Sequence, residues 1–173
     1  AGTPFWLRCV YDAGVLAPDL LAAARRRHSP DAPPPLSLFT AALPPADPDA
    51  ATVRFDRPAQ VRDLRAAVTG WAAAAGLPAD RVADLTLAVH EVAVNSLRHG
   101  GGRGTLRYWT EGRSLVCEVS DSGHITDPLV GRLRPTTSQL SGRGVWLANQ
   151  LCDLVRIRSS ASGTTVRLHM FLP

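Results

Sequence analysis

The sequence predicts an α/β fold of the two-layer type, with helices on one face of a mixed, mostly antiparallel β-sheet. Strand and helix patterns follow one another from about residue 51 to the end of the chain, and two pairs of neighbouring strand patterns are joined by short turns. The chain has 173 residues, of which 45% are hydrophobic, so it can bury the core of one ordinary domain.

The elements of this domain can be placed in order along the chain. A strand at 52–55 leads to a helix over about 59–75, which Gly76 closes. Pro78 begins a second, amphipathic helix, because proline is well suited to a helix start. The remaining expected elements are strands at 105–110 and 114–120, a helix at 145–152, and strands at 154–158 and 164–171.

The chain divides into three expected parts. Residues 29–50 are rich in proline, which favours an extended linker over a helix. Before the linker, residues 1–28 contain one strand pattern, Phe5–Asp12, and one helical pattern, which are too little for a domain of their own. We therefore expect an incomplete N-terminal piece at 1–28, a linker at 29–50 and a complete domain at 51–173.

Composition narrows the function classes. The net charge is +4, but the arginines are spread along the chain, so a direct nucleic-acid partner is not expected. The sequence has neither a run of about 18 apolar residues nor a basic-then-apolar leader, so we expect a cytoplasmic protein without a membrane partner. Its three cysteines lie far apart in apolar patterns and are expected to be buried free thiols: Cys9, Cys117 and Cys152.

The helix that ends near Gly100 carries two polar residues on an otherwise apolar pattern. Glu91 and Asn95 are four residues apart and therefore share one helix face, while Leu85 and Val89 lie on the opposite face. A carboxylate and a carboxamide placed in this way can hold a divalent cation against a polyphosphate, because Mg2+ prefers oxygen ligands. The alternative is a solvated helix face.

Two later segments add groups that can bind a nucleotide. Asp121 ends an alternating strand, where its carboxylate can accept a hydrogen bond from an exocyclic amine, and Gly123 allows the backbone to come close. Gly142, Arg143 and Gly144 precede a helix, where exposed backbone N–H groups and an arginine can bind phosphate. Taken singly, the first segment is more typical of an ordinary turn, and the alternative for the second is a flexible loop before a helix.

In this order and spacing the three segments resemble the N, G1 and G2 elements of the GHKL ATP-binding superfamily. The similarity is greatest to bacterial anti-sigma-factor serine kinases, particularly those of actinobacterial regulators. It covers residues 52–173 and rests on the motifs EVAVNSLRHG, SDSG, DPLVGR, GRGVWLANQLCD and SGTTVRLHM. The resemblance implies the two-layer GHKL fold and ATP and Mg2+ as ligands.

The resemblance also implies a role for each matching residue. Asn95 would ligate Mg2+, Glu91 would be the general base for a protein hydroxyl, and Asp121 would recognise adenine. Thr164 is similar to the family threonine that supports the adenine contact through water. Gly142, Arg143 and Gly144 would belong to the phosphate-binding box.

The sequence departs from the family pattern at the first glycine box. His124 follows Gly123, and the second glycine of the usual Asp-x-Gly-x-Gly is missing. Residues 124–141 would form the lid over ATP, and this lid contains Arg132 and Arg134, either of which can be a phosphate ligand or a solvated arginine. The N-terminal piece resembles the end of the MEDS-type sensory domains that precede such kinases, and the relatives suggest a homodimer.

Three functions remain open. The resemblance favours a serine/threonine protein kinase that acts on an anti-sigma antagonist, binds a sigma factor and controls transcription by partner switching. The loss of a glycine at His124 keeps open an ATP-binding or degenerate interaction module without kinase turnover. The third hypothesis is the catalytic domain of a sensor histidine kinase, because His90 and Glu91 are adjacent and resemble a His–Glu pair.

Overall fold

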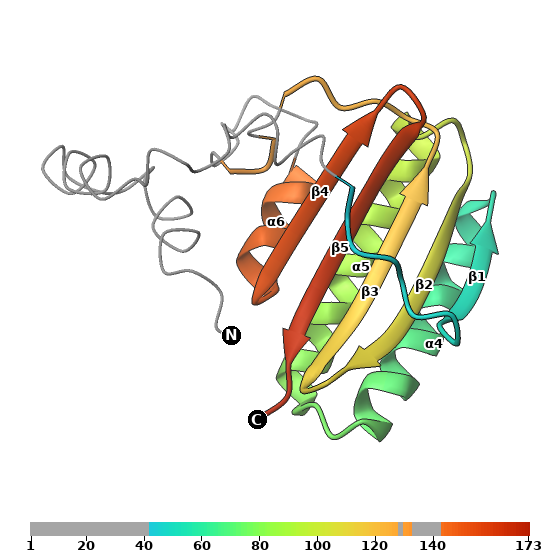
Figure 1. The fold of residues 1–173 in the computed structure, drawn as a ribbon. Helices are drawn as coiled ribbons and strands as arrows, with labels where there is room; N and C mark the ends of the chain where they lie inside the picture. The colour runs from blue at the N-terminus through green and yellow to red at the C-terminus, as the bar shows by residue number, and fades with distance from the viewer. Residues whose placement is uncertain (1–41, 128–129, 133–142) are drawn as a thin grey trace, which may run out of the picture.

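The computed structural model of the chain describes residues 42–127, 130–132 and 143–173. In this described part, three helices cover one face of a five-stranded sheet (Figure 1). The strand order is β1-β2-β3-β5-β4, and each pair of neighbours is antiparallel. The elements are β1 Ala51–Phe55, α4 Pro58–Ala74, α5 Ala79–His99, β2 Gly104–Glu111, β3 Ser114–Asp121, α6 Arg143–Leu151, β4 Leu154–Ser160 and β5 Gly163–Phe171.

The two-layer fold predicted from the sequence is confirmed, and each element expected from residue 52 onward is present. The observed bounds differ from the expected ones by at most two residues. The expected strand and helix within residues 1–28, the linker residues 29–41 and Cys9 lie outside the described residues. Residues 42–50, the rest of the expected linker, run across the sheet on the face without helices (Figure 1).

The start of α4 shows how local sequence sets a helix boundary. Pro58 occupies the first helical position, where its missing N–H group costs nothing. The Gln60 Oε1 atom accepts hydrogen bonds from the backbone N–H groups of Asp56 and Arg57 at 2.8 and 2.9 Å. These contacts provide partners for two backbone N–H groups at the helix start that have no acceptor within the helix.

Helix α5 lies at the centre of the helical layer, between α4 and α6, and packs on β2, β3 and β5. On the apolar face of α5, Leu85 and Val89 are fully buried, as the amphipathic pattern predicts. The hydroxyls of Thr69 and Thr86 join α4 to α5 at 3.0 Å. On the other side, Arg81 donates from Nη1 to the Leu151 carbonyl at 2.9 Å, which ties α5 to the end of α6.

The sheet contributes the other half of the core through alternate residues of its strands. Leu106, Leu115 and Leu168 are fully buried on the face turned towards the helices. Cys117 and Cys152 are free and buried. Burial raises the pKa of both thiols, that of Cys152 to about 12, so both remain protonated at neutral pH.

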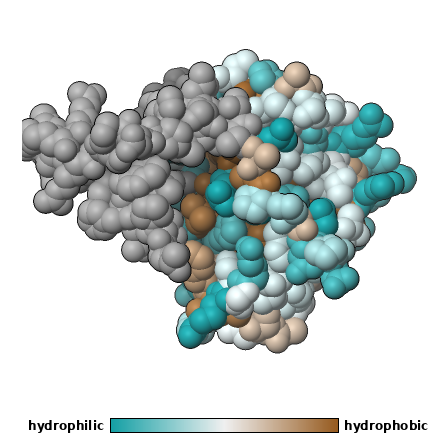
Figure 2. Space-filling view, in the orientation of Figure 1, coloured by the Kyte–Doolittle hydropathy of each residue, from teal (hydrophilic) through white to brown (hydrophobic). Residues whose placement is uncertain are grey.

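The helix-free face of the sheet is more polar. Figure 2 views the molecule from this side and shows hydrophilic residues over much of the described surface. His169 lies on this face, is 7% exposed, and has a pKa lowered to about 4 by burial and by Arg156 and Arg167. Its imidazole is therefore neutral at pH 7. None of the helices among the described residues is long and apolar enough to cross a membrane.

The β4–β5 turn provides a test of the register of the sheet. Gly163 has a φ of 126°, and a Cβ added there would lie 2.2 Å from the Asp121 carbonyl oxygen. We expect Gly163→Ala to lower the free energy of unfolding by about 2 kcal/mol or more, because it combines backbone strain with a clash against main chain. Urea unfolding followed by far-UV circular dichroism measures this change.

Gly70 is the matched control for that substitution. It lies exposed inside α4, and no atom lies within 4 Å of an added Cβ. Gly70→Ala should raise the free energy of unfolding by roughly 0.5–1 kcal/mol, since alanine loses less backbone entropy in a helix. An equal effect of the two substitutions would contradict the assigned turn.

Candidate functional site

The candidate site lies where α5, the end of β3 and the start of α6 meet in the helical layer. Glu91 and Asn95 come from α5, and Gly144 comes from the first turn of α6. Asp121 is the last residue of β3, and Thr164 lies opposite it on β5. The fold thus brings together predicted residues from four separate segments.

Glu91 and Asn95 face α6. A Cβ added to Gly144 would lie 2.8 Å from Asn95 Nδ2 and 3.0 Å from Glu91 Oε2, so the glycine allows the ends of both side chains to approach the backbone of α6. Both polar side chains are half-buried. Neither makes a hydrogen bond to another described residue. Their oxygens are therefore available to a ligand, and the face that they share is not simply a solvated one.

This arrangement fits a bound Mg2+ ion with phosphate. Among the described residues there is no cluster of three His, Cys, Asp or Glu side chains that could coordinate a metal ion by itself. Mg2+ is commonly held by one or two protein oxygens together with substrate phosphates and waters. Glu91 and Asn95 can supply such oxygens, and the N-terminus of α6 beside them has backbone N–H groups that favour phosphate.

Asp121 is held in place by two hydrogen bonds. Ser96 Oγ donates to its Oδ2 at 2.6 Å, and the backbone N–H of Gly123 donates to its Oδ1 at 2.8 Å. Gly100 allows this contact, because an added Cβ would lie 2.4 Å from the Asp121 Cγ. Each carboxylate oxygen can still accept one more hydrogen bond, so Asp121 is both fixed and able to bind a ligand donor.

Thr164 supports the turn that follows Asp121. Its hydroxyl donates to the Gly123 carbonyl at 2.9 Å. Because that proton is used, the 2.9 Å contact between Ser159 Oγ and Thr164 Oγ1 must be donated by Ser159. Ser159 in turn accepts the backbone N–H of Ile125 at 2.8 Å. The first residues after Asp121 are therefore fastened to the β4–β5 hairpin.

His124 belongs to the same network. Its Nδ1 lies 3.3 Å from the Ser160 carbonyl and 3.4 Å from Ser159 Oγ. A carbonyl only accepts, and the Ser159 proton is already directed to Thr164, so the network assigns a proton to Nδ1. The residue that departs from the glycine box thus connects the residues that follow β3 to β4.

Two residues of this site, Ser96 and Ser159, are not predicted by the sequence motifs. Ser96 directly follows Asn95 and connects α5 to Asp121, and Ser159 connects β4 to Thr164 and Ile125. The sequence signal for Ser96 is a polar residue at a position that helical periodicity assigns to the buried face. A buried hydroxyl needs a partner, but the sequence does not say which one.

The remaining predicted residues are only partly described. Gly142 and Arg134 lie outside the described residues. Arg143 begins α6, and Arg132 lies in the short described piece at 130–132. Both arginines interact with other groups in the structure, so their part in a site stays a prediction.

A hollow of about 530 Å³ also borders Asp121. Its walls include Arg54, Arg103, Thr105 and Ser120. Glu91, Asn95 and Gly144 do not line it. We therefore place the candidate site in the helical layer, where Glu91 and Asn95 meet the N-terminus of α6, and not in this hollow.

Comparison with known proteins finds a matching family and a solved structure with a similar fold. The family described as histidine kinase-like ATPase domain matches residues 56–170. A similar solved structure is the crystal structure of the RsbU and RsbW domains of Rv1364c from Mycobacterium tuberculosis, with a TM-score of 0.52 and 21% identity over 70% of this chain. This chain spans 32% of that one, and the likeness concerns the fold alone. No curated protein matches the sequence significantly.

The hydrogen bond from Ser96 leads to a prediction about nucleotide affinity. Ser96→Ala removes a charge-assisted hydrogen bond that orients Asp121, and bonds of this kind typically contribute about 1.5–3 kcal/mol. We expect ATP affinity, measured by calorimetry, to fall roughly tenfold or more.

Ser120→Ala is the control, because Ser120 lies one residue away on the other face of β3 and bonds to Thr165 at 3.1 Å. It should leave ATP affinity unchanged. Equal losses in the two variants would show that Ser96 does not act through Asp121.

Proposed function

The chain belongs to the histidine kinase-like ATPase domain family, and from this membership we propose that it is an ATP-dependent protein kinase of the anti-sigma-factor type. Its substrate would be a serine or threonine of an antagonist protein. The observation that carries the proposal is the convergence of Glu91, Asn95 and Gly144 at the start of α6. In the proposed kinase, Glu91 is the base, Asn95 is the metal ligand and the start of α6 is the phosphate-binding helix end.

Each residue has a distinct task in the proposed reaction. Asp121 accepts a hydrogen bond from the adenine amine and thereby sets the position of the nucleotide. Asn95 offers its side-chain oxygen to Mg2+, and the backbone N–H groups at the start of α6 bind phosphate oxygens. When held there, Mg2+ would supply neutralisation of the charge that develops on the phosphates.

Glu91 acts as the general base. Its carboxylate takes the proton from the hydroxyl of the substrate protein as that oxygen bonds to the γ-phosphorus of ATP. The bond between the γ-phosphorus and the bridging oxygen breaks, and ADP leaves. Glu91 suits this role because its side chain lies beside the phosphate-binding end of α6 and makes no hydrogen bond to another described residue that would hold it away.

An interaction module without turnover is the second candidate. His124 and Ser159 fasten the first residues of the lid segment to β4, and a lid that closes over ATP must move. In that case the chain would bind ATP and its partners but transfer no phosphate. The histidine-kinase reading has less support, because His90 is part of α5 and its Nδ1 is buried without a partner among the described residues.

The wider biological role follows from the resemblance and stays a proposal. The protein partners would be a sigma factor and its anti-sigma antagonist, and the kinase would control transcription by switching between them. We place this activity in the cytoplasm and expect a homodimer.

The metal assignment leads to a prediction about Mg2+-dependent ATP binding. Asn95→Ala should abolish the part of ATP binding that depends on Mg2+, because it removes one of few protein oxygens available to the ion. Calorimetry with and without Mg2+ separates this loss from a general loss of nucleotide binding. Asp84→Asn is the control, since Asp84 lies on the same helix face but pairs with Arg81. Unchanged Mg-ATP affinity in Asn95→Ala would refute the assignment.

The assignment of Glu91 as the base leads to a prediction about phosphotransfer. Glu91→Gln keeps the size of the side chain but cannot take a proton, so ATP should bind nearly normally while phosphotransfer falls about a hundredfold or more. The measurement is transfer of labelled γ-phosphate to a candidate antagonist protein. Full activity of the variant would exclude Glu91 as the base. An inactive parent that still binds ATP would select the interaction module.

A further inference from the structure

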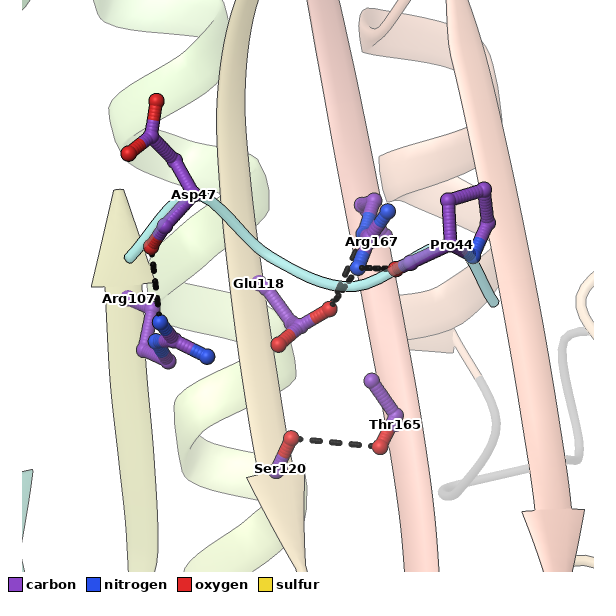
Figure 3. A network of polar contacts seen from close by, with 7 residues as sticks. All are labelled: Pro44, Asp47, Arg107, Glu118, Ser120, Thr165 and Arg167. Carbon is purple, nitrogen blue, oxygen red and sulfur yellow. Dashed lines mark hydrogen bonds and ion pairs between the residues drawn. The ribbon is translucent and has the colours of Figure 1, made fainter. Parts of the chain in front are cut away.

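Residues 42–47 lie across the helix-free face of the sheet, over β5, β3 and β2, and we call them the strap (Figures 1 and 3). Two arginines of the sheet hold its backbone. Arg167 Nη2 donates to the Pro44 carbonyl at 2.8 Å, and Arg107 Nη2 donates to the Asp47 carbonyl at 2.9 Å. The strap is therefore bound through main-chain oxygens that are three residues apart.

The sheet is organised in advance for this contact. Glu118 lies opposite Arg107 on one side and opposite Arg167 on the other, so the three residues form one row across three strands. Arg167 Nε donates to Glu118 Oε2 at 2.9 Å, and the Trp109 ring lies 5.0 Å from the Arg167 Cζ. These contacts fix the guanidinium plane before the strap binds, so little further side-chain freedom is lost on binding.

The sequence of the strap suits a segment that crosses strands and does not pair along one. Pro44 and Pro45 have no N–H groups, so these two residues offer carbonyls and leave no backbone donor unpaired. Proline also favours an extended backbone before binding. At the end of the strap, Asp47 Oδ1 accepts a hydrogen bond from the backbone N–H of Asp49 at 2.8 Å. The turn formed there leads into β1.

Packing beneath the strap is incomplete. A hollow of about 240 Å³ lies between Ala42, Leu43 and Pro44 on one side and Arg158 and Thr165 on the other. The buried Nε of Arg158 has no hydrogen-bond partner among the described residues. Pro44 and Pro45 themselves are exposed. The strap is thus held chiefly by the two arginine contacts and not by an interlocked apolar core.

We propose that this face of the sheet is a binding surface for an extended, proline-rich peptide segment, and that the strap is its occupant within the same chain. Arg107 and Arg167 recognise the carbonyl spacing, and Glu118 and Trp109 hold Arg167 in position. The strap leaves and re-enters this surface while the domain remains folded. The strap thus connects the residues that precede it to the helix-free face of β3 and β5, the two strands that carry Asp121 and Thr164.

Limited proteolysis of the full chain tests this proposal without nucleotide. A protease that cleaves before aspartate can cut the Ala46–Asp47 bond only when the strap is released, and mass spectrometry identifies that cut. Arg107→Met keeps the apolar stem of the side chain but removes the donor, and it should speed this cleavage about tenfold, as expected for the loss of one charge-assisted hydrogen bond. Replacing Pro44 and Pro45 by glycine alters no sheet residue and should also speed it.

Arg156→Met is the matched control, because Arg156 continues the same row on β4, opposite Arg167, but makes no hydrogen bond to the strap. Its cleavage rate should stay within about twofold of the wild-type rate. Equal rates in Arg107→Met and the wild type, or an equal increase in Arg156→Met, would overturn the proposal. Protection that disappears on dilution would also overturn it, since the strap would then come from a second copy. Thermal unfolding of each variant verifies that the domain is folded.

Discussion

The antiparallel register of β3 with β5 is the constraint on which both faces of the sheet depend. It places Asp121 opposite Thr164 and, three residues earlier on β3, Glu118 opposite Arg167. Because successive side chains of a strand point to opposite faces, Asp121 is directed to the helical layer and Glu118 to the helix-free face. A slip of one residue would exchange the faces and would remove both the site and the arginine row.

Helix α5 connects this sheet to the rest of the site. Within six residues of this helix, Glu91 and Asn95 lie beside α6, and Ser96 donates a hydrogen bond to Asp121. Its own position is fixed from three sides, by Thr86 against α4, by Arg81 against the end of α6, and by its apolar face against the sheet. A rigid helix is a suitable carrier for such groups, because ligand-binding geometry depends on side chains whose support does not move.

The buried pair of Glu118 and Arg167 serves orientation more than stability. Arg167 is 3% exposed and Glu118 is 7% exposed, so both charges lose most of their hydration on folding. Burying two charges costs about as much as their attraction returns, and such a pair is weak evidence for stability. What the pair provides is a guanidinium with a fixed plane, which can then hold a backbone carbonyl of the strap.

The sequence by itself determined the elements of the domain and the placement of Glu91 and Asn95 on one helix face, because these features follow from the local repeat of helix and strand. Its motifs also predicted Asp121, Gly144 and Thr164 as site residues, but they did not specify which of these residues are in contact. Only the tertiary structure decided that Gly144 lies against Asn95, that Ser96 holds Asp121, and that residues 42–47 cross the sheet. These contacts join residues far apart in the chain, so they depend on strand register and helix packing, which no local pattern specifies.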